Sequence, residues 1–263
     1  MAMRGFQGSL GKIQRKSRLL AVKELAGFAK LDVGREIRKG IPEVVLAEGK
    51  APGDVVGIAQ AMVERTGRAI ISRVDGACVR LLRSKIRNGN GTRLDYLPRS
   101  RIVLVKSRSF QVSPSGGRVG ILTAGTSDIP VAEEAETIAK EMGCETRAYY
   151  DVGVAGLHRL FDPLTDLLKW DADVVLVVAG REGALPTVVA GIVDVPVVGV
   201  PTSKSYGFGE KGLAALAAML QSCSLGMSVV NIDGGVGAGA VAAMIANRMG
   251  QARNRGSGRR GPR

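Results

Sequence analysis

Residues 222–239, SCSLGMSVVNIDGGVGAG, are the stretch around which the fold of this chain is organised. A cysteine, Cys223, follows a predicted helix, and a Val-Val-Asn-Ile strand then leads into a glycine-rich turn that opens another helix. Glycines let backbone amides approach an anion closely, and a helix N-terminus adds partial positive charge. The stretch therefore predicts a nucleophile candidate and an anion-accepting turn at opposite ends of one strand, unless neighbouring loops or a second subunit bring them together.

The sequence before this stretch follows the same order of strand, turn and helix. Apolar runs predict strands at residues 119–123, 146–150, 174–179, 197–200 and 228–232, alternating with helices near 130–142, 155–169, 183–193, 209–222 and 237–249. Strands that are continuously apolar are covered on both faces. The pattern therefore predicts an α/β fold with a parallel, doubly wound, three-layer sheet.

A smaller α/β domain is predicted ahead of this sheet. Strands are expected at residues 44–46, 69–73 and 102–106, with helices at 52–65 and 76–84 and an amphipathic helix at 9–27. The Ser-Pro-Ser-Gly-Gly run at 113–117 is typical of a linker. The predicted organisation is a small α/β domain with a basic N-terminal arm at 1–112, a catalytic domain at 118–249 and a basic disordered tail at 250–263.

The net charge of +13 is concentrated at the two ends of the chain. Residues 1–20 contribute five positive charges and residues 248–263 contribute six, with no acidic residue in either stretch. Such tails are most simply solvated, so neither nucleic acid nor a membrane is expected as the partner. The three cysteines form no C-x-x-C pair, and no stretch approaches the roughly eighteen apolar residues of a membrane span. We therefore expect a cytoplasmic protein.

The loops that follow the five predicted strands each combine glycine with polar or charged residues. They read AGTSD at 124–128, DVGVAG at 151–156, AGREG at 179–183, PTSKSYGFG at 201–209 and DGGVGAG at 233–239. In open parallel sheets, ligands bind beyond the carboxyl ends of the strands. Five convergent loops therefore predict a ligand site at this edge of the sheet more strongly than any single motif does.

Several residues in these loops have both a structural and a functional interpretation. Thr126, Ser127 and Asp128 precede a helix, so they suit either N-capping or the binding of a carboxylate or phosphate. Glu182 opens the predicted helix near 183–193. There its carboxylate either stabilises the helix through the helix dipole or acts as a general base facing the site.

His158 is the single histidine of the chain, and Cys223 is one of three cysteines. A lone histidine is usually packed or solvated, although Arg159 beside it and the glycine-rich loop before it keep a binding role open. Cys223 suits either a buried inert thiol or a nucleophile activated by a nearby cation such as Lys204 or Lys211. The sequence has no GxxxxGK[ST] loop, no GxSxG elbow and no His/Cys cluster at metal-ligand spacing. With a single histidine in the chain, Asp, Glu and Cys would therefore carry any proton transfer.

These motifs together resemble a known family. AGTSD at 124–128, GVAGLHR at 153–159 and VVAGREGALPTVVAGI at 177–192 resemble the aminoimidazole-ribotide carboxylase fold. LDVGREIRKGIPEVVLAEGK at 31–50 and CSLGMSVVNIDGGVGAG at 223–239 resemble, more particularly, pyridinium-3,5-biscarboxylic acid mononucleotide synthase, the first enzyme of nickel-pincer cofactor assembly for lactate racemase. That family has Cys-Ala-Pro-Gly and Asp-Asn-Gly-Phe-Gly-Ala-Gly at the corresponding places, so this chain departs at several positions but retains the cysteine and the turn.

The resemblance implies carboxylation of nicotinic acid adenine dinucleotide at pyridinium C5, with CO2 or bicarbonate as co-substrate, and release of AMP. A pyridinium ring is electron-poor, so addition of Cys223 at C4 would turn C5 into a nucleophile. On the same resemblance, Glu182 would accept the proton, Ser127 and Asp128 would orient the incoming carboxyl group, and His158 with Arg159 would balance charge. The remaining binding residues would be Thr126, Gly180, Asp233, Gly235, Gly237 and Gly239.

The resemblance also implies a high-order homo-oligomer, such as an octamer, with sites between subunits. No tightly bound cofactor or metal is expected, while assistance by Mg2+ is left open because acidic positions exist without ligand spacing. Two alternatives remain. One is a carboxylase or mutase of aminoimidazole ribotide in purine synthesis, for which Cys223 would be dispensable. The other is a nucleotide-sensing or RNA-associated protein whose basic tails are the functional part.

Overall fold

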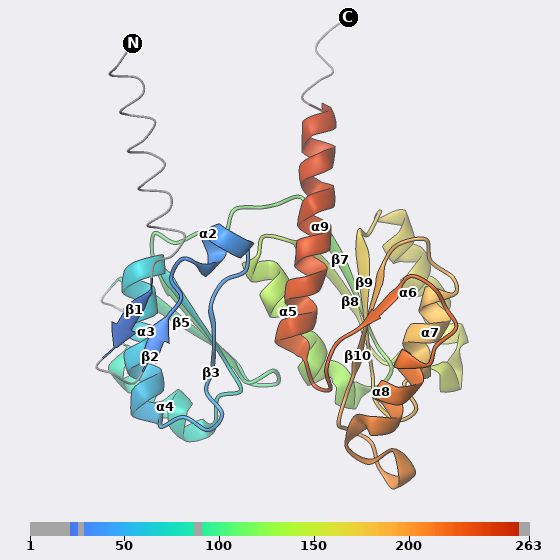
Figure 1. Cartoon of the computed structure of the whole chain (residues 1–263), viewed down its shortest axis with the longest axis horizontal. Coiled ribbons are helices and arrows are strands. Elements are labelled where there is room, and N and C mark those ends of the chain that lie inside the picture. Colours follow the sequence, from blue (N-terminus) through green and yellow to red (C-terminus); the bar gives the residue numbers. More distant parts are fainter. Residues whose placement is uncertain (1–21, 26–28, 87–90, 258–263) are drawn as a thin grey trace, which may run out of the picture. The chain divides into compact units, whose positions relative to one another are not determined.

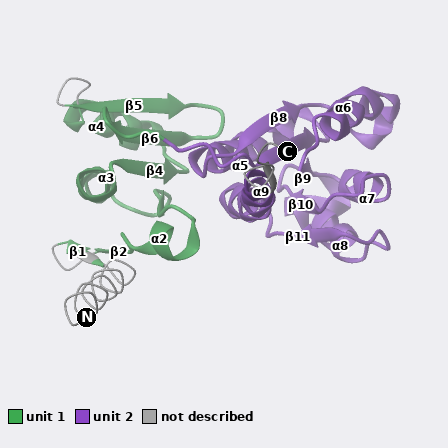
Figure 2. Ribbon diagram, turned by 90° about the horizontal axis from the view of Figure 1, so that it is seen from above, with its two compact units in different colours: residues 1–111 green, residues 112–263 purple. Residues whose placement is uncertain are grey.

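The computed structural model describes residues 22–25, 29–86 and 91–257 and divides the chain into two compact units (Figures 1 and 2). Unit 1 comprises residues 1–111 and unit 2 comprises residues 112–263. The predicted basic arm at residues 1–20 and the last part of the predicted tail, residues 258–263, lie outside the described residues.

Unit 1 contains a four-stranded sheet with the strand order β3-β4-β6-β5 and a separate pair, β1-β2. The strands are β1 (Lys23–Leu25), β2 (Ala29–Leu31), β3 (Val44–Leu46), β4 (Arg68–Ser72), β5 (Thr92–Leu97) and β6 (Ile102–Ser107), and the helices are α2 (Arg35–Lys39), α3 (Pro52–Thr66) and α4 (Gly76–Lys85). The first strand corrects the prediction of a helix reaching residue 27, because its described part pairs antiparallel with β2 instead.

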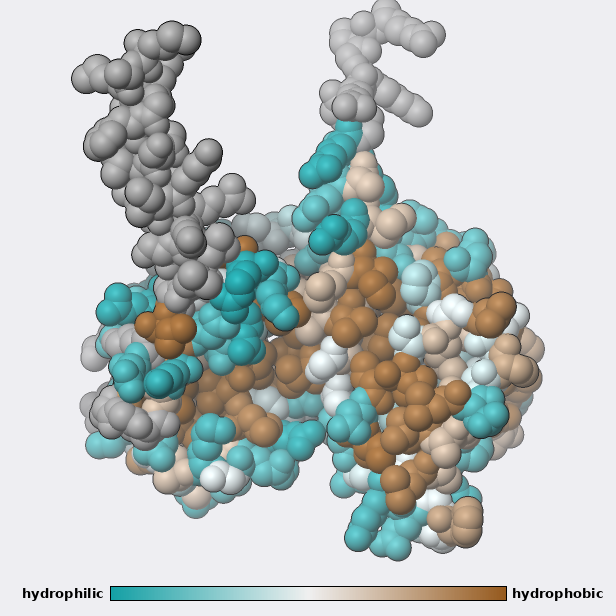
Figure 3. All heavy atoms as spheres, in the orientation of Figure 1, coloured by the Kyte–Doolittle hydropathy of each residue, from teal (hydrophilic) through white to brown (hydrophobic). Residues whose placement is uncertain are grey.

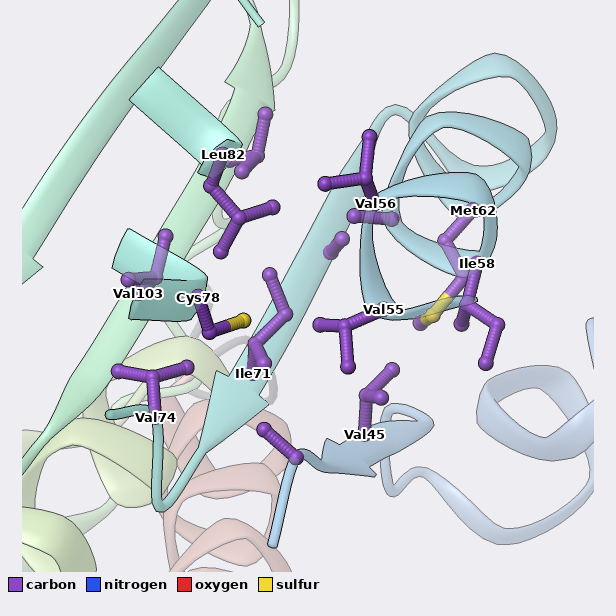
Figure 4. Close-up of a cluster of buried hydrophobic side chains, with 14 of the residues drawn as sticks. Val45, Val55, Val56, Ile58, Met62, Ile71, Val74, Cys78, Leu82 and Val103 are labelled. Atoms are coloured by element: carbon purple, nitrogen blue, oxygen red, sulfur yellow. The ribbon is translucent and has the colours of Figure 1, made fainter. Parts of the chain in front are cut away.

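The helices α3 and α4 of unit 1 pack their apolar faces together against the sheet (Figure 4). Helix α3 starts with Pro52 in its first turn and ends at Gly67, whose φ of 81° is the left-handed conformation typical of a helix C-cap. Val55 on α3, Ile71 on β4 and Leu82 on α4 are completely buried in the shared core. Burying each such side chain contributes about 1.5–3 kcal/mol, so unit 1 has a hydrophobic core of its own.

Unit 2 contains a five-stranded sheet with the order β11-β10-β9-β7-β8, in which every pairing is parallel. The strands are β7 (Arg118–Thr123), β8 (Glu145–Tyr149), β9 (Val174–Ala179), β10 (Val197–Pro201) and β11 (Met227–Val229), and the helices are α5 (Ile129–Glu141), α6 (His158–Lys169), α7 (Ala184–Ala190), α8 (Leu213–Leu220) and α9 (Gly235–Ser257). Helices α5 and α9 cover one face, and α6, α7 and α8 cover the other (Figure 2). The predicted doubly wound three-layer sheet is confirmed.

The strand order of unit 2 determines where a ligand can enter. From β7 the chain runs to β8 on one side, and the next strand, β9, lies on the other side of β7. Loops after β7 and β9 therefore diverge at this topological switch point, which is where doubly wound sheets bind their ligands.

The C-terminal region corrects the prediction of a disordered tail beginning at residue 250. Helix α9 continues to Ser257, and Arg253 Nη2 donates hydrogen bonds to Asp173 Oδ2 at 2.8 Å and to Gly116 O at 2.6 Å. The Asp173 side chain is only 3% exposed. The charge pattern predicted a solvated tail, but one arginine in it has a nearly buried partner within unit 2.

Candidate active site

The loop after β7 places one acidic side chain inside the candidate site. Asp128 is 3% exposed; its Oδ2 accepts a hydrogen bond from Gly125 N at 3.0 Å and its Oδ1 accepts one from Thr202 Oγ1 at 2.7 Å. The carboxylate turns back to its own loop and makes no capping bond to α5. Burial raises the pKa of Asp128 above its ordinary value, and hydrogen bonds from Thr202, Gly125 and Gly180 oppose that rise.

The turn after β9 approaches Asp128 so closely that a glycine is required at its start. A Cβ atom on Gly180 would lie 2.8 Å from Thr202 Oγ1 and 3.4 Å from Asp128 Oδ1. The next residue, Arg181, has a φ of 45°, in the left-handed region that residues other than glycine rarely adopt. Arg181 and Glu182 both line the pocket that this turn borders.

The first turn of α6, which follows the loop after β8, brings an arginine to the site and leaves the single histidine outside the pocket lining. Arg159 Nη1 donates to Asp151 Oδ2 at 2.8 Å, and Asp151 N donates to Thr123 Oγ1 at 3.1 Å. Arg159 lines the pocket, whereas His158 is exposed and lies outside the lining. Of this predicted pair, the structure brings only Arg159 to the pocket.

These loops border a pocket of about 280 Å³ at the carboxyl ends of β7, β8, β9 and β10. Its polar and charged lining consists of Gly125, Ser127, Asp128, Gly153, Arg159, Gly180, Arg181, Glu182 and Lys204. The structure thus brings together five of the predicted site residues: Ser127, Asp128, Arg159, Gly180 and Glu182. Thr126, although in the same loop, is exposed and lies outside the lining.

Sequence reasoning missed two cations of this pocket as site residues. Arg181 lies within the AGREG loop and Lys204 within the PTSKSYGFG loop, and the sequence pattern suggests Lys204 only as a cation near Cys223. The signal that could have found them is a basic residue just beyond the carboxyl end of a parallel strand. Together with the carboxylates of Asp128 and Glu182, they make a pocket suited to binding anions and moving protons.

The predicted phosphate-binding turn at the start of α9 is largely engaged in helix packing. A Cβ atom on Gly235 would lie 2.5 Å from Glu134 Oε2 of α5, and one on Gly239 would lie 2.3 Å from Ala135 O. These two glycines therefore allow α5 and α9 to touch, and the Glu134 carboxylate already lies beside the N-terminus of α9. The third glycine, Gly237, is exposed and has open space around it.

Asp233, the first residue of this turn, links it to the loop after β10. Its Oδ1 accepts a hydrogen bond from Ser203 N at 2.8 Å, and its φ is 53°. Asp233 lies outside the pocket lining, although its charge adds to the rise in the pKa of Asp128. The turn therefore borders the pocket without lining it.

Cys223 is the exposed cysteine of the three, since Cys78 and Cys144 are buried. It lies between the end of α8 and the beginning of β11, near the amino ends of the strands. The pocket lies at their carboxyl ends. The neighbours of Cys223 are fastened to α7, because Ser224 Oγ donates to Thr187 O at 2.9 Å. Within one chain, the structure therefore does not bring Cys223 to Glu182.

Among residues 22–25, 29–86 and 91–257, no three His, Cys, Asp or Glu side chains form a group that could hold a metal ion. Within the same residues, no helix is both long and apolar enough to cross a membrane.

A doubly wound parallel sheet with carboxylates and cations at its switch point is an arrangement typical of α/β proteins that bind small molecules. Comparison with known families makes this more specific. The family model described as AIR carboxylase matches residues 118–255, and the one described as LarB/PurE-like N-terminal domain matches residues 22–108. The chain belongs to the AIR carboxylase family, and it is a carboxylase- or mutase-type enzyme.

The relatives of this chain fall into two groups. An uncharacterized protein of Methanocaldococcus jannaschii is 43% identical over 243 residues, covering 92% of this chain and 93% of its own length. The N5-carboxyaminoimidazole ribonucleotide mutase of Thermotoga maritima is 32% identical over 133 residues, covering 49% of this chain and 74% of its own length. The corresponding mutase of M. jannaschii is 34% identical over 127 residues, or 48% of this chain and 76% of its own length. The mutases therefore match about half of the chain, whereas the first relative matches nearly all of it.

Proposed function

We propose that this enzyme carboxylates nicotinic acid adenine dinucleotide at pyridinium C5 and cleaves its phosphoanhydride to release AMP. The observation that carries the proposal is the exposed thiol of Cys223, in an ending that resembles the pyridinium-biscarboxylate synthases. The LarB/PurE-like domain at residues 22–108 supports it, because the mutase relatives cover only about half of this chain.

The proposed carboxylation uses one nucleophile and one base, and water is the nucleophile that cleaves the phosphoanhydride. The Cys223 thiolate forms a bond to C4 of the pyridinium, and the ring electrons move to N1 to give a dihydropyridine. Its enamine carbon, C5, attacks CO2 and forms the new C–C bond, which leaves an iminium at N1 and C6. Glu182 then takes the C5 proton, and expulsion of the thiolate from C4 restores the aromatic ring.

The remaining pocket residues bind and orient. Ser127 and the buried Asp128 lie where they can orient the incoming carboxyl group. Arg159, Arg181 and Lys204 supply positive charge for the carboxylate and phosphates of the substrate.

The reaction needs Cys223 and Glu182 at the same ring, so we include a homo-oligomer in the proposal, with Cys223 of the partner subunit completing the pocket. Hydrophobic side chains gather over α8 and α9 on the face seen in Figure 3. Leu220 and Leu225, on either side of Cys223, are 68% and 91% exposed. Contact between copies through the surface around Leu220 and Leu225 would cover both leucines and bring the thiol to a neighbouring pocket.

The mutases among the relatives support a second candidate, a carboxylase or mutase of aminoimidazole ribotide. The two candidates differ in what they require of the thiol. In the purine reaction the substrate is already electron-rich and needs no cysteine adduct.

The deciding experiment incubates the full chain with nicotinic acid adenine dinucleotide and 13C-bicarbonate and follows AMP and labelled product by mass spectrometry. We expect both products from the wild type and neither from Cys223→Ser, since a serine alkoxide is inaccessible near neutral pH. Cys78→Ala, which changes a buried thiol of unit 1, is the control and should retain turnover. An active Cys223→Ser enzyme would refute the adduct, and activity on aminoimidazole ribotide alone would establish the second candidate.

A further inference from the structure

Two aromatic side chains lie exposed in the loop between β10 and α8. Tyr206 is 76% exposed and Phe208 is completely exposed. The same loop contributes Lys204 to the pocket lining. Aromatic side chains are large apolar groups that proteins usually cover, so two of them on one short loop beside a pocket indicate a binding surface.

Arg181 connects these rings to the pocket. Its guanidinium carbon lies 4.1 Å from the centroid of the Tyr206 ring, within the range of a cation–π contact, while its side chain also lines the pocket. Within the part of the chain that the structure describes, neither Arg181 nor Lys204 forms an ion pair with a carboxylate. Two such cations beside exposed rings suit a ligand in which a phosphate is attached to a planar base.

Hydrogen bonds of the Ser205 side chain connect parts of the backbone in the loop between β10 and α8. Ser205 Oγ donates to Gly209 O and accepts a hydrogen bond from Gly212 N at 3.2 Å. Gly207 and Gly212 have φ values of 75° and 82°, so both turns of the loop use a conformation natural to glycine. The loop is thus a defined structure that leaves Tyr206 and Phe208 exposed, and its exposed rings need no refolding to meet a ligand.

The size of the pocket shows why a second binding surface is needed. Pockets that enclose a drug-sized ligand span about 300–1,000 Å³, and this one has about 280 Å³. A dinucleotide consists of two ring-bearing halves joined through phosphates. Within one chain the pocket can therefore hold one of these halves, and the other extends beyond its lining.

We propose that Tyr206, Phe208 and Arg181 form a stacking platform for the adenine base of the dinucleotide, with Lys204 on the adjoining phosphate. The choice of substrate rests on the proposed function. The platform itself rests on the exposure of the rings, the contact between Arg181 and Tyr206, and the volume of the pocket. Stacking recognises the flat face of the base and accounts for how AMP is held until it leaves.

Calorimetric titration of the full chain with AMP and with ribose 5-phosphate, which lacks the base, tests the platform. We expect AMP to bind the wild type more tightly than ribose 5-phosphate does. Tyr206→Ala and Phe208→Ala should each weaken AMP binding at least about fivefold, the lower end of the effect of removing a base-stacking ring, and leave ribose 5-phosphate binding unchanged. Tyr206→Phe should retain AMP binding, and Phe161→Ala, at an exposed aromatic residue outside the pocket lining, is the matched control.

Unchanged AMP affinity in both alanine variants would overturn the platform. A lower oligomeric mass with unchanged AMP affinity would also overturn it and assign the rings to a contact between copies. The proposed function is judged separately. If the wild type does not convert the dinucleotide but AMP binding depends on Tyr206 and Phe208, the platform stands and the proposed function fails. If it converts the dinucleotide and both alanine variants keep the wild-type KM, the platform fails and the proposed function stands.

Discussion

The contact between α5 and α9 predicts opposite effects for alanine at two glycines of the same helix. Alanine in place of glycine stabilises an exposed helical position by up to about 1 kcal/mol. At Gly237 nothing lies within 4 Å of the new Cβ atom, so Gly237→Ala should raise the free energy of unfolding by this amount. At Gly239 the Cβ atom would lie 2.3 Å from Ala135 O, which is a backbone atom of α5 and cannot rotate away as a side chain can. Overpacking costs about 1–3 kcal/mol, so Gly239→Ala should lower the free energy of unfolding by about 2 kcal/mol.

Urea unfolding measures the two variants in the same way. Trp170, the single tryptophan, lies in unit 2 against its core, so its fluorescence reports unfolding of that unit. A loss of about 2 kcal/mol corresponds to roughly a 4–8 °C lower Tm for a domain of this size. Wild-type stability of Gly239→Ala would refute the packing interpretation. Equal destabilisation by Gly237→Ala would show that the loss is not due to the clash.

Three further predictions concern the site and the end of α9. Glu182→Gln should retain the fold and slow turnover in the mass-spectrometric assay about 10²–10⁴-fold, as is typical of a general acid–base residue; an unchanged rate would leave Glu182 as a helix-start carboxylate. Because the folded-state pKa of Asp128 is raised, its stabilising contribution is present at low pH and lost as pH rises above the ordinary value of 3.8 through the folded pKa. The free energy of unfolding of the wild type relative to Asp128→Asn should therefore fall over that range, and parallel pH profiles would contradict this. Arg253→Ala leaves the buried Asp173 carboxylate without its cation and should cost about 1–3 kcal/mol in urea unfolding, whereas the exposed Arg255→Ala should cost less than about 0.5 kcal/mol; equal effects would remove the special role of Arg253.

The fold of unit 2 was predictable because its central strands β9 and β10 are continuous apolar runs followed by glycine and polar residues. The six residues of β9 are all buried, so nothing interrupted the run. The strands of unit 1 were harder to predict from the sequence. Strand β5, with the sequence TRLDYL, mixes charged and apolar residues, and only its pairing with β6 makes it a strand. Its backbone hydrogen bonds are made to β6, and the composition of β5 does not reveal this pairing.

The pocket was predictable from the sequence in part. Loops at the carboxyl ends of strands converge by geometry, which is why Ser127, Asp128 and Glu182 could be grouped from sequence. The glycines of α9 could not be interpreted in this way, because close helix packing and close approach of a phosphate both require a missing side chain. Only the position of α5 distinguishes the two for Gly235 and Gly239.

The hydrogen bond from Thr202 to Asp128 also bears on when the site forms during synthesis. The two residues are 74 positions apart, and the hydroxyl comes from the far end of β10. A nascent chain that has emerged as far as α7 already contains Asp128, Gly180 and Glu182, but it lacks the hydroxyl of Thr202 that holds the buried carboxyl group. Domains complete their folding as the later strands leave the ribosome. The pocket is therefore one of the last features of unit 2 to mature, and truncated translation products ending before β10 carry its residues without its geometry.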